Sequence, residues 1–327
     1  MNMAEKTRVL AVVGPTASGK TALGVGLARL YGGQVISADS MQIYRGMDIA
    51  TAKPTAGEMQ GVKHHLLDFL DIEERYSVAA FVSDARKLIG EIAAAGGRPM
   101  VVGGTGLYVQ ALLSNMEFQP EEEKNEVRAL LEARRTQEGI EALYAELCKI
   151  DPAYASTVHV NNEKRVLRAL EIYYTTGKTP TEYRAQTVAS PSDYRSLILG
   201  LDYRDRETLY ALIDRRVDRM LEAGLLEEAR AYFAARPSAT AAQAIGYKEL
   251  AGYFAGTCTL EEAKENLKRA TRRYAKRQLT WFKRMPDVHW IVLEKPDAEE
   301  ARQAAVRIIE ETGFYGAADG RQTGLPE

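Results

Sequence analysis

The 327-residue sequence contains few of the residues that build disulfide or metal scaffolds. It has two cysteines, Cys148 and Cys258, far apart and in unrelated contexts, and four histidines. This composition argues against a disulfide framework and against a structural zinc cluster, and it is typical of thiols in a reducing compartment. We therefore expect a cytoplasmic protein.

Long apolar runs and a strong excess of one charge are also missing. No apolar stretch approaches the ~18 residues of a membrane span, and the polar segment from Met1 to Arg8 lacks the apolar run of a signal peptide. The net charge is −2, so a nucleic-acid partner would have to be held by local basic patches. Apolar residues make up 46%, enough for a sizeable core in one large domain or two modest ones.

The first third of the chain alternates predicted strands with predicted helices. Continuous apolar runs predict strands at Val9–Val13, Gln34–Asp39 and Pro99–Val102. Helical spacing of apolar residues predicts helices at 20–31 and 77–95. This order is typical of a parallel α/β sheet with right-handed crossovers.

The pattern changes near Met116 and returns near Leu197. Between 120 and 177 the spacing is helical without a convincing strand, and the Pro-, Ser- and Thr-rich stretch 179–193 predicts a linker. A strand is predicted again at 197–201. Two long helices, a strand and a last helix are then expected at 205–235, 260–284, 288–292 and 299–312.

A glycine-rich pattern, G-x-x-x-x-G-K-[ST], lies between the first strand and the first helix. Its residues are Gly14, Pro15, Thr16, Ala17, Ser18, Gly19, Lys20 and Thr21. In such a loop the backbone N–H groups and the helix N-terminus bind phosphate oxygens, the lysine reaches the outer phosphate, and the threonine hydroxyl can bind Mg²⁺. The loop predicts binding of a diphosphate or triphosphate without saying which.

The predicted fold class is a P-loop NTPase-like parallel sheet flanked by helices, with an all-helical insertion domain. The α/β core with its C-terminal helices is expected at 1–117 and 191–315, and the insertion at 118–190. The remaining residues, 316–327, have little to bury and predict a loose tail.

Two features argue against a standard ATPase. The strand at 99–102 runs into Gly103-Gly104-Thr105, without the acidic residue that normally supports Mg²⁺ there. The carboxylate at a strand end near the loop is that of Asp39, at the edge where open α/β sheets bind ligands. Asp39 could act in catalysis, hold Mg²⁺ or cap a helix.

Seven stretches, in the family order, resemble the bacterial tRNA dimethylallyltransferases. They are 14–21, 36–54, 64–68, 102–108, 165–171, 243–249 and 273–282. The phosphate loop alone is generic, whereas Ile36–Pro54 and Arg273–Phe282 are specific to the family. Ala50 stands where we would expect glycine, which bears on backbone shape.

The resemblance implies transfer of a dimethylallyl group from dimethylallyl diphosphate to N6 of adenosine 37 in tRNA, with release of diphosphate. The loop would bind the diphosphate with Mg²⁺, held in part by Thr21. By the same resemblance, Asp39 is the general base, Thr105 is a hydroxyl beside the donor phosphates, and Arg216 steadies the diphosphate. From the residues alone, Thr105 could also be a turn residue, and Arg216 a surface ion-pair residue.

The resemblance also implies a surface for the anticodon stem-loop of tRNA. Its family-based contacts are Asp39, Ser40, Met41, Gln42, Gln243, Gly246, Tyr247 and Lys248. In the insertion, Lys164, Arg165 and Arg168 occupy adjoining helical positions suited to phosphates or loop bases. Basic residues recur at spacings of three and four between 268 and 277, and Arg272, Arg273 and Lys276 are predicted phosphate contacts. A solvated basic helix packed on the core is the alternative.

Two other functions are compatible with a phosphate loop. One is a small-molecule or nucleotide kinase that binds ATP and uses Asp39 for the acceptor hydroxyl. The other is a nucleic-acid-binding ATPase without covalent chemistry on RNA. The resemblance favours the tRNA prenyltransferase, acting as a monomer and without a membrane.

Overall fold

The computed structural model describes residues 6–114, 116, 126–187 and 192–315. The chain divides into two compact units, Met1–Leu113 with Asp193–Glu327, and Ser114–Ser192. The sequence-based boundaries lie at 117/118 and 190/191, and the predicted tail lies outside the described residues. In the part of the chain that is described, none of the helices combines the length and the apolar character that a membrane span requires.

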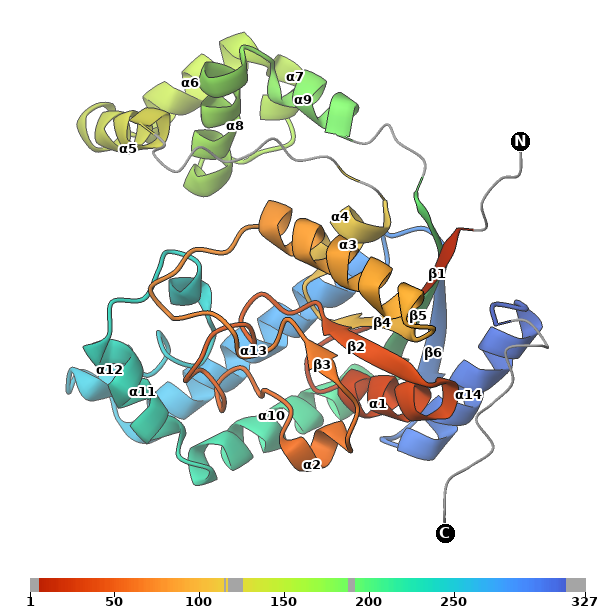
Figure 1. The fold of residues 1–327 in the computed structure, drawn as a ribbon. Coiled ribbons are helices and arrows are strands. Elements are labelled where there is room, and N and C mark those ends of the chain that lie inside the picture. Colours follow the sequence, from red (N-terminus) through yellow and green to blue (C-terminus); the bar gives the residue numbers. More distant parts are fainter. Residues whose placement is uncertain (1–5, 115, 117–125, 188–191, 316–327) are drawn as a thin grey trace, which may run out of the picture. The chain divides into compact units, whose positions relative to one another are not determined.

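The larger unit is built on a six-stranded parallel sheet of order β3-β2-β4-β1-β5-β6 (Figure 1). The predicted α/β fold class is therefore confirmed. Beyond the strands predicted from the sequence, the sheet has a two-residue edge strand, β3. The strands are β1 (Thr7–Val13), β2 (Gly33–Ser37), β3 (His64–His65), β4 (Arg98–Gly103), β5 (Tyr194–Tyr203) and β6 (Val288–Leu293).

The register brings the carboxyl ends of the central strands level with one another. Val13 at the end of β1 is paired with Gly103 of β4, and Ser37 at the end of β2 is paired with Val102 of β4. Because all these strands are parallel, the loops that follow β1, β2 and β4 leave the sheet at the same edge.

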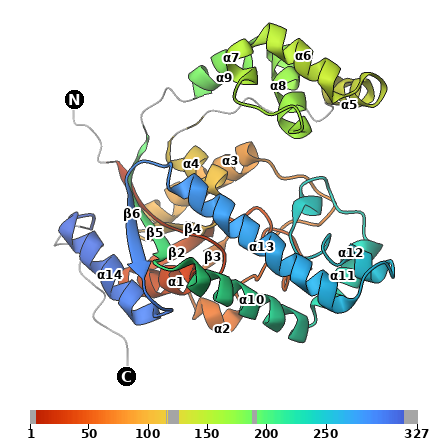
Figure 2. The ribbon, with the colours of Figure 1, turned by 180° about the vertical axis from the view of Figure 1, so that it is seen from behind.

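Helices cover both faces of this sheet. In Figures 1 and 2, α1 and α14 lie together on one face, and α3 and α4 lie on the other. Opposite faces are expected, because right-handed crossovers that run in opposite directions along a sheet place their helices on opposite sides. The helices of this unit are α1 (Lys20–Tyr31), α2 (Ala56–Met59), α3 (Val78–Ala94), α4 (Gly106–Leu113), α10 (Arg206–Glu222), α11 (Leu225–Ala234), α12 (Ala251–Phe254), α13 (Leu260–Phe282) and α14 (Ala298–Glu311), with a 3₁₀ turn at Ala241–Gln243.

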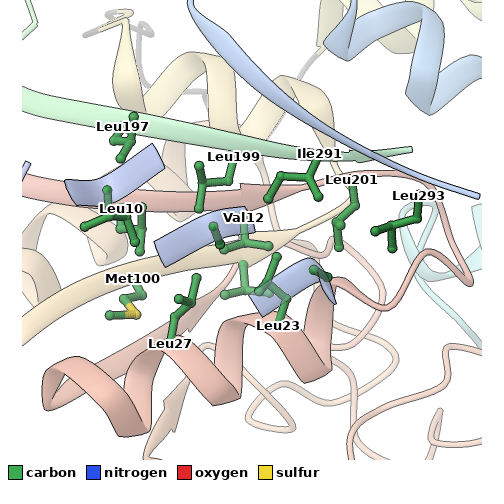
Figure 3. Packing of buried hydrophobic residues seen from close by; sticks show 14 of the residues in the cluster. Leu10, Val12, Leu23, Leu27, Met100, Leu197, Leu199, Leu201, Ile291 and Leu293 are labelled. Carbon is green, nitrogen blue, oxygen red and sulfur yellow. The ribbon is translucent and has the colours of Figure 1, made fainter. Parts of the chain in front are cut away.

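The core beneath the phosphate loop is aliphatic. Leu10 and Val12 alternate along β1, so both side chains point to the same face of the sheet. There they pack with Leu199 of β5 and Leu27 of α1, and all four side chains are fully buried (Figure 3). Burial of side chains of this size contributes roughly 1.5–3 kcal/mol each. The loop between β1 and α1 is therefore anchored at both ends in well-packed structure.

Between residues 126 and 187 the smaller unit consists of helices joined by turns, as predicted. Its helices are α5 (Glu126–Glu138), α6 (Ile140–Ile150), α7 (Pro152–Ala155), α8 (Glu163–Thr176) and α9 (Pro180–Thr187). Leu131, Leu143, Leu147, Val166 and Leu170 belong to its own buried core. These helices therefore need no strand to bury their apolar faces.

Two element predictions are wrong. The expected linker after Gly177 contains α9, because Thr179 and Glu182 bond each other's backbone N–H groups and Pro180 occupies the first helical turn. The single helix expected at 205–235 is two helices, α10 and α11. They are separated at Gly224, whose φ of 102° cannot continue a helix.

Candidate active site

The predicted phosphate loop joins β1 to α1. A Cβ on Gly14 would lie 2.9 Å from the Leu201 carbonyl oxygen and 2.9 Å from Ser18 Oγ, so no larger residue fits there. Gly19 takes a left-handed φ of 89° immediately before the first helical residue, Lys20. The two glycines are thus required for different reasons, close approach at one end and backbone conformation at the other.

A cavity of about 350 Å³ lies beside this loop. The predicted site residues that line it are Thr16, Lys20, Thr21, Asp39, Ser40, Met41, Gln42, Arg216, Gln243, Gly246 and Lys248. The lining also includes Val217 and Met220 of α10 and Leu267 of α13, which the sequence analysis did not single out. The cavity therefore combines charged groups with an apolar side.

Among the described residues, four cations, Lys20, Arg216, Lys248 and Arg277, and the carboxylate of Asp39 line the cavity. Of these, Lys20 and Arg216 interact with each other and with Asp39. Burial and the nearby Arg216 guanidinium lower the pKa of Lys20 to about 8, against the opposing effect of Asp39. Burial also lowers the pKa of Arg216, and again Asp39 acts in the opposite direction. The two cations repel each other, so a polyanion that pairs with both would be stabilised.

Asp39 closes a turn as well as lining the cavity. It follows β2 by two residues, and its Oδ1 accepts the backbone N–H of Met41 at 2.9 Å and of Gln42 at 3.4 Å. The sequence left open whether Asp39 caps a helix. Its carboxylate does accept nearby backbone N–H groups, but these bonds stabilise the turn 39–42 and not a helix. The turn directs residues 39–42 to the cavity.

Thr105 supports this turn. Its Oγ1 accepts the backbone N–H of Ser40 at 3.0 Å and donates to Ser40 Oγ at 3.3 Å. Among the described residues that line the cavity, Thr105 is absent. The structure therefore places Thr105 outside the cavity lining, where it is hydrogen-bonded to Ser40, a residue of the lining.

Gln278 of α13 is a connecting residue that the sequence analysis missed. Its buried side chain accepts the Thr16 N–H at 2.8 Å and donates to the Gly104 carbonyl at 2.9 Å. A Cβ on Gly104 would lie 2.2 Å from Gln278 Nε2, so glycine leaves the space this amide occupies. Gln278 thus ties the phosphate loop to the loop after β4. Its place inside the family-specific stretch 273–282 was the available signal.

The basic residues of α13 divide into two groups. Arg272 pairs with both oxygens of Asp214 at 2.6 and 2.7 Å, and Lys268, which is 9% exposed, pairs with Asp218 at 3.0 Å. These pairs join α13 to α10, which lies beside it (Figure 2). Arg273 and Lys276 are exposed. A phosphate contact by Arg272 would require it to leave its carboxylate.

Arg216 lies on α10 between the two paired aspartates in sequence. Asp214 and Asp218 hold α10 against α13 from positions two residues before and after it. The neighbouring arginines, Arg215 and Arg219, are exposed and do not line the cavity. The predicted arginine is therefore the one that the fold turns inward.

Other predicted contacts do not line the cavity. Tyr247 is fully buried, between Gly246 and Lys248 of the lining. Lys164, Arg165 and Arg168 are exposed on α8 of the smaller unit, where Arg168 also pairs with Glu171 at 3.1 Å.

A parallel sheet with a glycine-rich loop after β1 and a cationic cavity at its carboxyl edge defines a phosphate-binding protein of the P-loop type. The family model for IPP transferase matches residues 42–285. The chain belongs to the IPP transferase family, which confirms the resemblance found in the sequence.

The similar proteins span nearly the whole chain. This chain is 48% identical over 316 residues to a tRNA dimethylallyltransferase of Geobacillus kaustophilus (strain HTA426). The match covers 96% of this chain and 97% of that protein. The solved full-length tRNA isopentenylpyrophosphate transferase of Bacillus halodurans is 44% identical, with a TM-score of 0.69 over 94% of this chain and 97% of that one. A eukaryotic dimethylallyltransferase solved in the course of acting on tRNA is 30% identical, with a TM-score of 0.80 over 97% of this chain and 81% of that one.

The lowered pKa of Lys20 predicts a pH dependence of anion binding. Below about pH 8 the ammonium is charged and attracts inorganic diphosphate, and as the pH rises through that value the charge is lost. The Kd for diphosphate should therefore rise by up to about tenfold per pH unit, the limit for one coupled proton. Calorimetric titration between about pH 7 and 9.5 measures this dependence.

Lys20→Arg is the matched control, because a guanidinium keeps its charge across this range. The ratio of the two Kd values removes the titration of diphosphate itself. A ratio that stays constant with pH would show that Lys20 is not the titrating group.

Proposed function

We propose that this protein transfers a dimethylallyl group from dimethylallyl diphosphate to N6 of adenosine 37 in tRNA and releases diphosphate. The observation that carries the proposal is the cavity in which Lys20, Arg216 and Asp39 meet beside a phosphate loop. Membership in the IPP transferase family and the tRNA substrates named for the similar proteins support it.

The phosphate loop and the two cations receive the diphosphate. Departure of diphosphate builds negative charge on its oxygens, and Lys20, Arg216 and the loop N–H groups stabilise that charge. The cations are already fixed in the cavity, so little reorganisation is needed as the charge develops. The apolar lining by Val217, Met220 and Leu267 suits the dimethylallyl group.

The transfer itself exchanges one bond for another. The N6 amine attacks C1 of the dimethylallyl group, the N6–C1 bond forms, the C1–O bond breaks, and diphosphate leaves with the bonding electron pair. The proton that N6 must lose passes to the Asp39 carboxylate, the general base. Because a stacked base cannot enter a cavity, adenosine 37 leaves its stack at a cost of a few kcal/mol, lowest in a loop. The anticodon stem-loop meets that requirement.

The residues beside the phosphate loop are suited to Mg²⁺. Mg²⁺ favours oxygen ligands and is commonly bound by one or two protein groups together with substrate phosphates. Thr21 supplies a hydroxyl that lines the cavity. In the described part of the chain no cluster of three or more His, Cys, Asp or Glu residues is placed to hold a metal, so diphosphate oxygens would complete the shell. Bound there, Mg²⁺ would neutralise charge on the leaving diphosphate.

Two further groups are proposed to bind the stem-loop. The turn 39–42 is assigned by family resemblance, and Lys164, Arg165 and Arg168 of the smaller unit are assigned by their adjoining positions on a helix. We propose that the enzyme acts as a monomer. A cytoplasmic location agrees with the free thiols of Cys148 and Cys258.

A labelling assay tests the proposed reaction. Purified protein is incubated with Mg²⁺, unmodified tRNA and radiolabelled dimethylallyl diphosphate, and the expected result is label in the RNA at adenosine 37. Absence of label in RNA, with γ-phosphate transfer from ATP to a small acceptor, would establish a kinase instead. RNA-stimulated ATP hydrolysis alone would establish an ATPase.

Replacing the proposed base tests its role. Asp39→Asn keeps an oxygen that can accept the Met41 N–H but removes the basic carboxylate. We expect kcat to fall by at least ~10²-fold, the usual scale for a lost general base, with tRNA affinity within about threefold of wild type. Single-turnover transfer and filter binding measure the two quantities. Nearly intact turnover would remove Asp39 as the base.

The exposed part of the basic helix generates a salt-dependence prediction. Arg273→Ala with Lys276→Ala should raise the KM for tRNA by about tenfold and reduce the slope of log affinity against log salt by about two, with an unchanged melting temperature. Arg272→Ala is the contrasting variant. It leaves Asp214 unpaired, so it should lower the melting temperature. An unchanged KM and slope in the double variant would exclude this face from tRNA binding.

A further inference from the structure

Glu228 of α11 holds one loop through its backbone. Its Oε2 accepts the N–H groups of Asp48 at 2.8 Å and Ile49 at 2.7 Å, and its Oε1 accepts the N–H of Ala50 at 2.9 Å. Hydrogen bonds to an ionised carboxylate are roughly twice as strong as neutral ones. Three consecutive N–H groups converging on one anion fix the conformation of the loop.

The same carboxylate also binds a second segment. The Tyr247 hydroxyl donates to Glu228 Oε1 at 2.9 Å. The Tyr247 ring is fully buried and stacks on Tyr232 with centroids 3.9 Å apart and an interplanar angle of 4°. Burial and the adjacent Glu228 raise the pKa of Tyr247, so the phenol keeps its proton and stays a donor. Glu228 therefore connects two segments that are far apart in the sequence.

Both segments form part of the cavity lining, and we call them the wall. The wall consists of residues 50–52 and 243–246 with Lys248. Its two halves touch, because a Cβ on Gly246 would lie only 2.7 Å from Ala50 Cβ. Gln42 Nε2 adds bonds to the Thr51 and Ala52 carbonyl oxygens, at 3.2 and 3.1 Å. The wall is thus joined both to the Asp39 turn and, through Glu228, to α11.

We propose that Glu228 is a positioning residue for RNA binding, which shapes the wall that receives the extruded nucleotide and its neighbours. This inference rests on the proposed tRNA function. Glu228 is not among the described residues that line the cavity, so it acts through the residues it holds. The diphosphate is assigned to the phosphate loop and Arg216, and the hydrogen bonds of Glu228 go to neither of them. Loss of Glu228 should therefore weaken tRNA binding and leave the donor unaffected.

Glu228→Gln is the direct test. In either amide orientation an NH₂ group faces N–H donors, so at least one bond is lost. We expect KM for tRNA to rise about tenfold or more, KM for dimethylallyl diphosphate to stay within about twofold, and kcat within about threefold. Hydrogen exchange of the amides of residues 48–50 should accelerate by about tenfold or more in the full-length protein.

Two further variants complete the design. Tyr247→Phe removes the bond to one segment only, so a rise in tRNA KM of about threefold is expected. It also provides the comparison if Glu228→Gln fails to fold. Glu227→Gln is the matched control, because Glu227 neighbours Glu228 on α11 but is exposed and pairs with Arg230 at 3.5 Å. It should match wild type in every measurement.

The outcomes separate this inference from the proposed function. A lower melting temperature with both KM values unchanged, or an equal rise in both, would make Glu228 a purely structural residue and overturn the inference. A wild-type protein that transfers no label to RNA would defeat the proposed function and this role with it. The exchange measurement is independent of activity, and rapid wild-type exchange at residues 48–50 would by itself refute a fixed wall.

Discussion

The site depends on the close approach of backbone turns at the carboxyl edge of the sheet. A Cβ on Gly103 would lie 2.2 Å from the Ala38 carbonyl oxygen, so the loop after β4 lies directly against the chain that leads to Asp39. Gly14 meets Leu201 of β5 in the same way. These glycines lie at the ends of neighbouring parallel strands, and their missing side chains bring the phosphate loop and the proposed base to one cavity.

Around this edge, polar side chains from helices and from the loop before α4 fix the loops. Gln278 joins the phosphate loop to Gly104, Thr105 supports the Asp39 turn, and Glu228 holds the wall. Each acts mainly on backbone groups, which would otherwise be left without partners when substrate excludes water from the cavity. The loops are therefore held in shape before a ligand arrives, which lowers the ordering cost of binding.

The sequence predicts the parts of this arrangement that local patterns specify. The apolar run before Gly14, the phosphate loop, and Asp39 at a strand end all follow from short stretches of residues. Gln278 and Glu228 could not be found in that way, because they bond groups 262 and about 180 residues distant in the chain. For a related reason, the basic pattern of α13 does not show which of its cations are paired within the protein. Spacing shows which residues share a helix face, but Lys268 and Arg272 turn to carboxylates of α10 that only the folded chain brings near. The failure to predict α9 has another cause, because the residues that cap this helix, Thr179 and Glu182, are neighbours in the sequence.

The charges inside the cavity explain why a protein with a net charge of −2 can be suited to polyanions. Lys20 and Arg216 are desolvated, the Arg216 guanidinium disfavours the charged form of Lys20, and Asp39 opposes the lowering of both pKa values. A ligand with a single negative charge could pair with only one of these two cations, and the charge of the other would stay uncompensated. A diphosphate carries enough charge for both, and its bridging geometry places that charge on adjacent phosphoryl groups. The pair of Lys20 and Arg216 therefore suits the proposed diphosphate donor, and the net charge of the protein has little bearing on that.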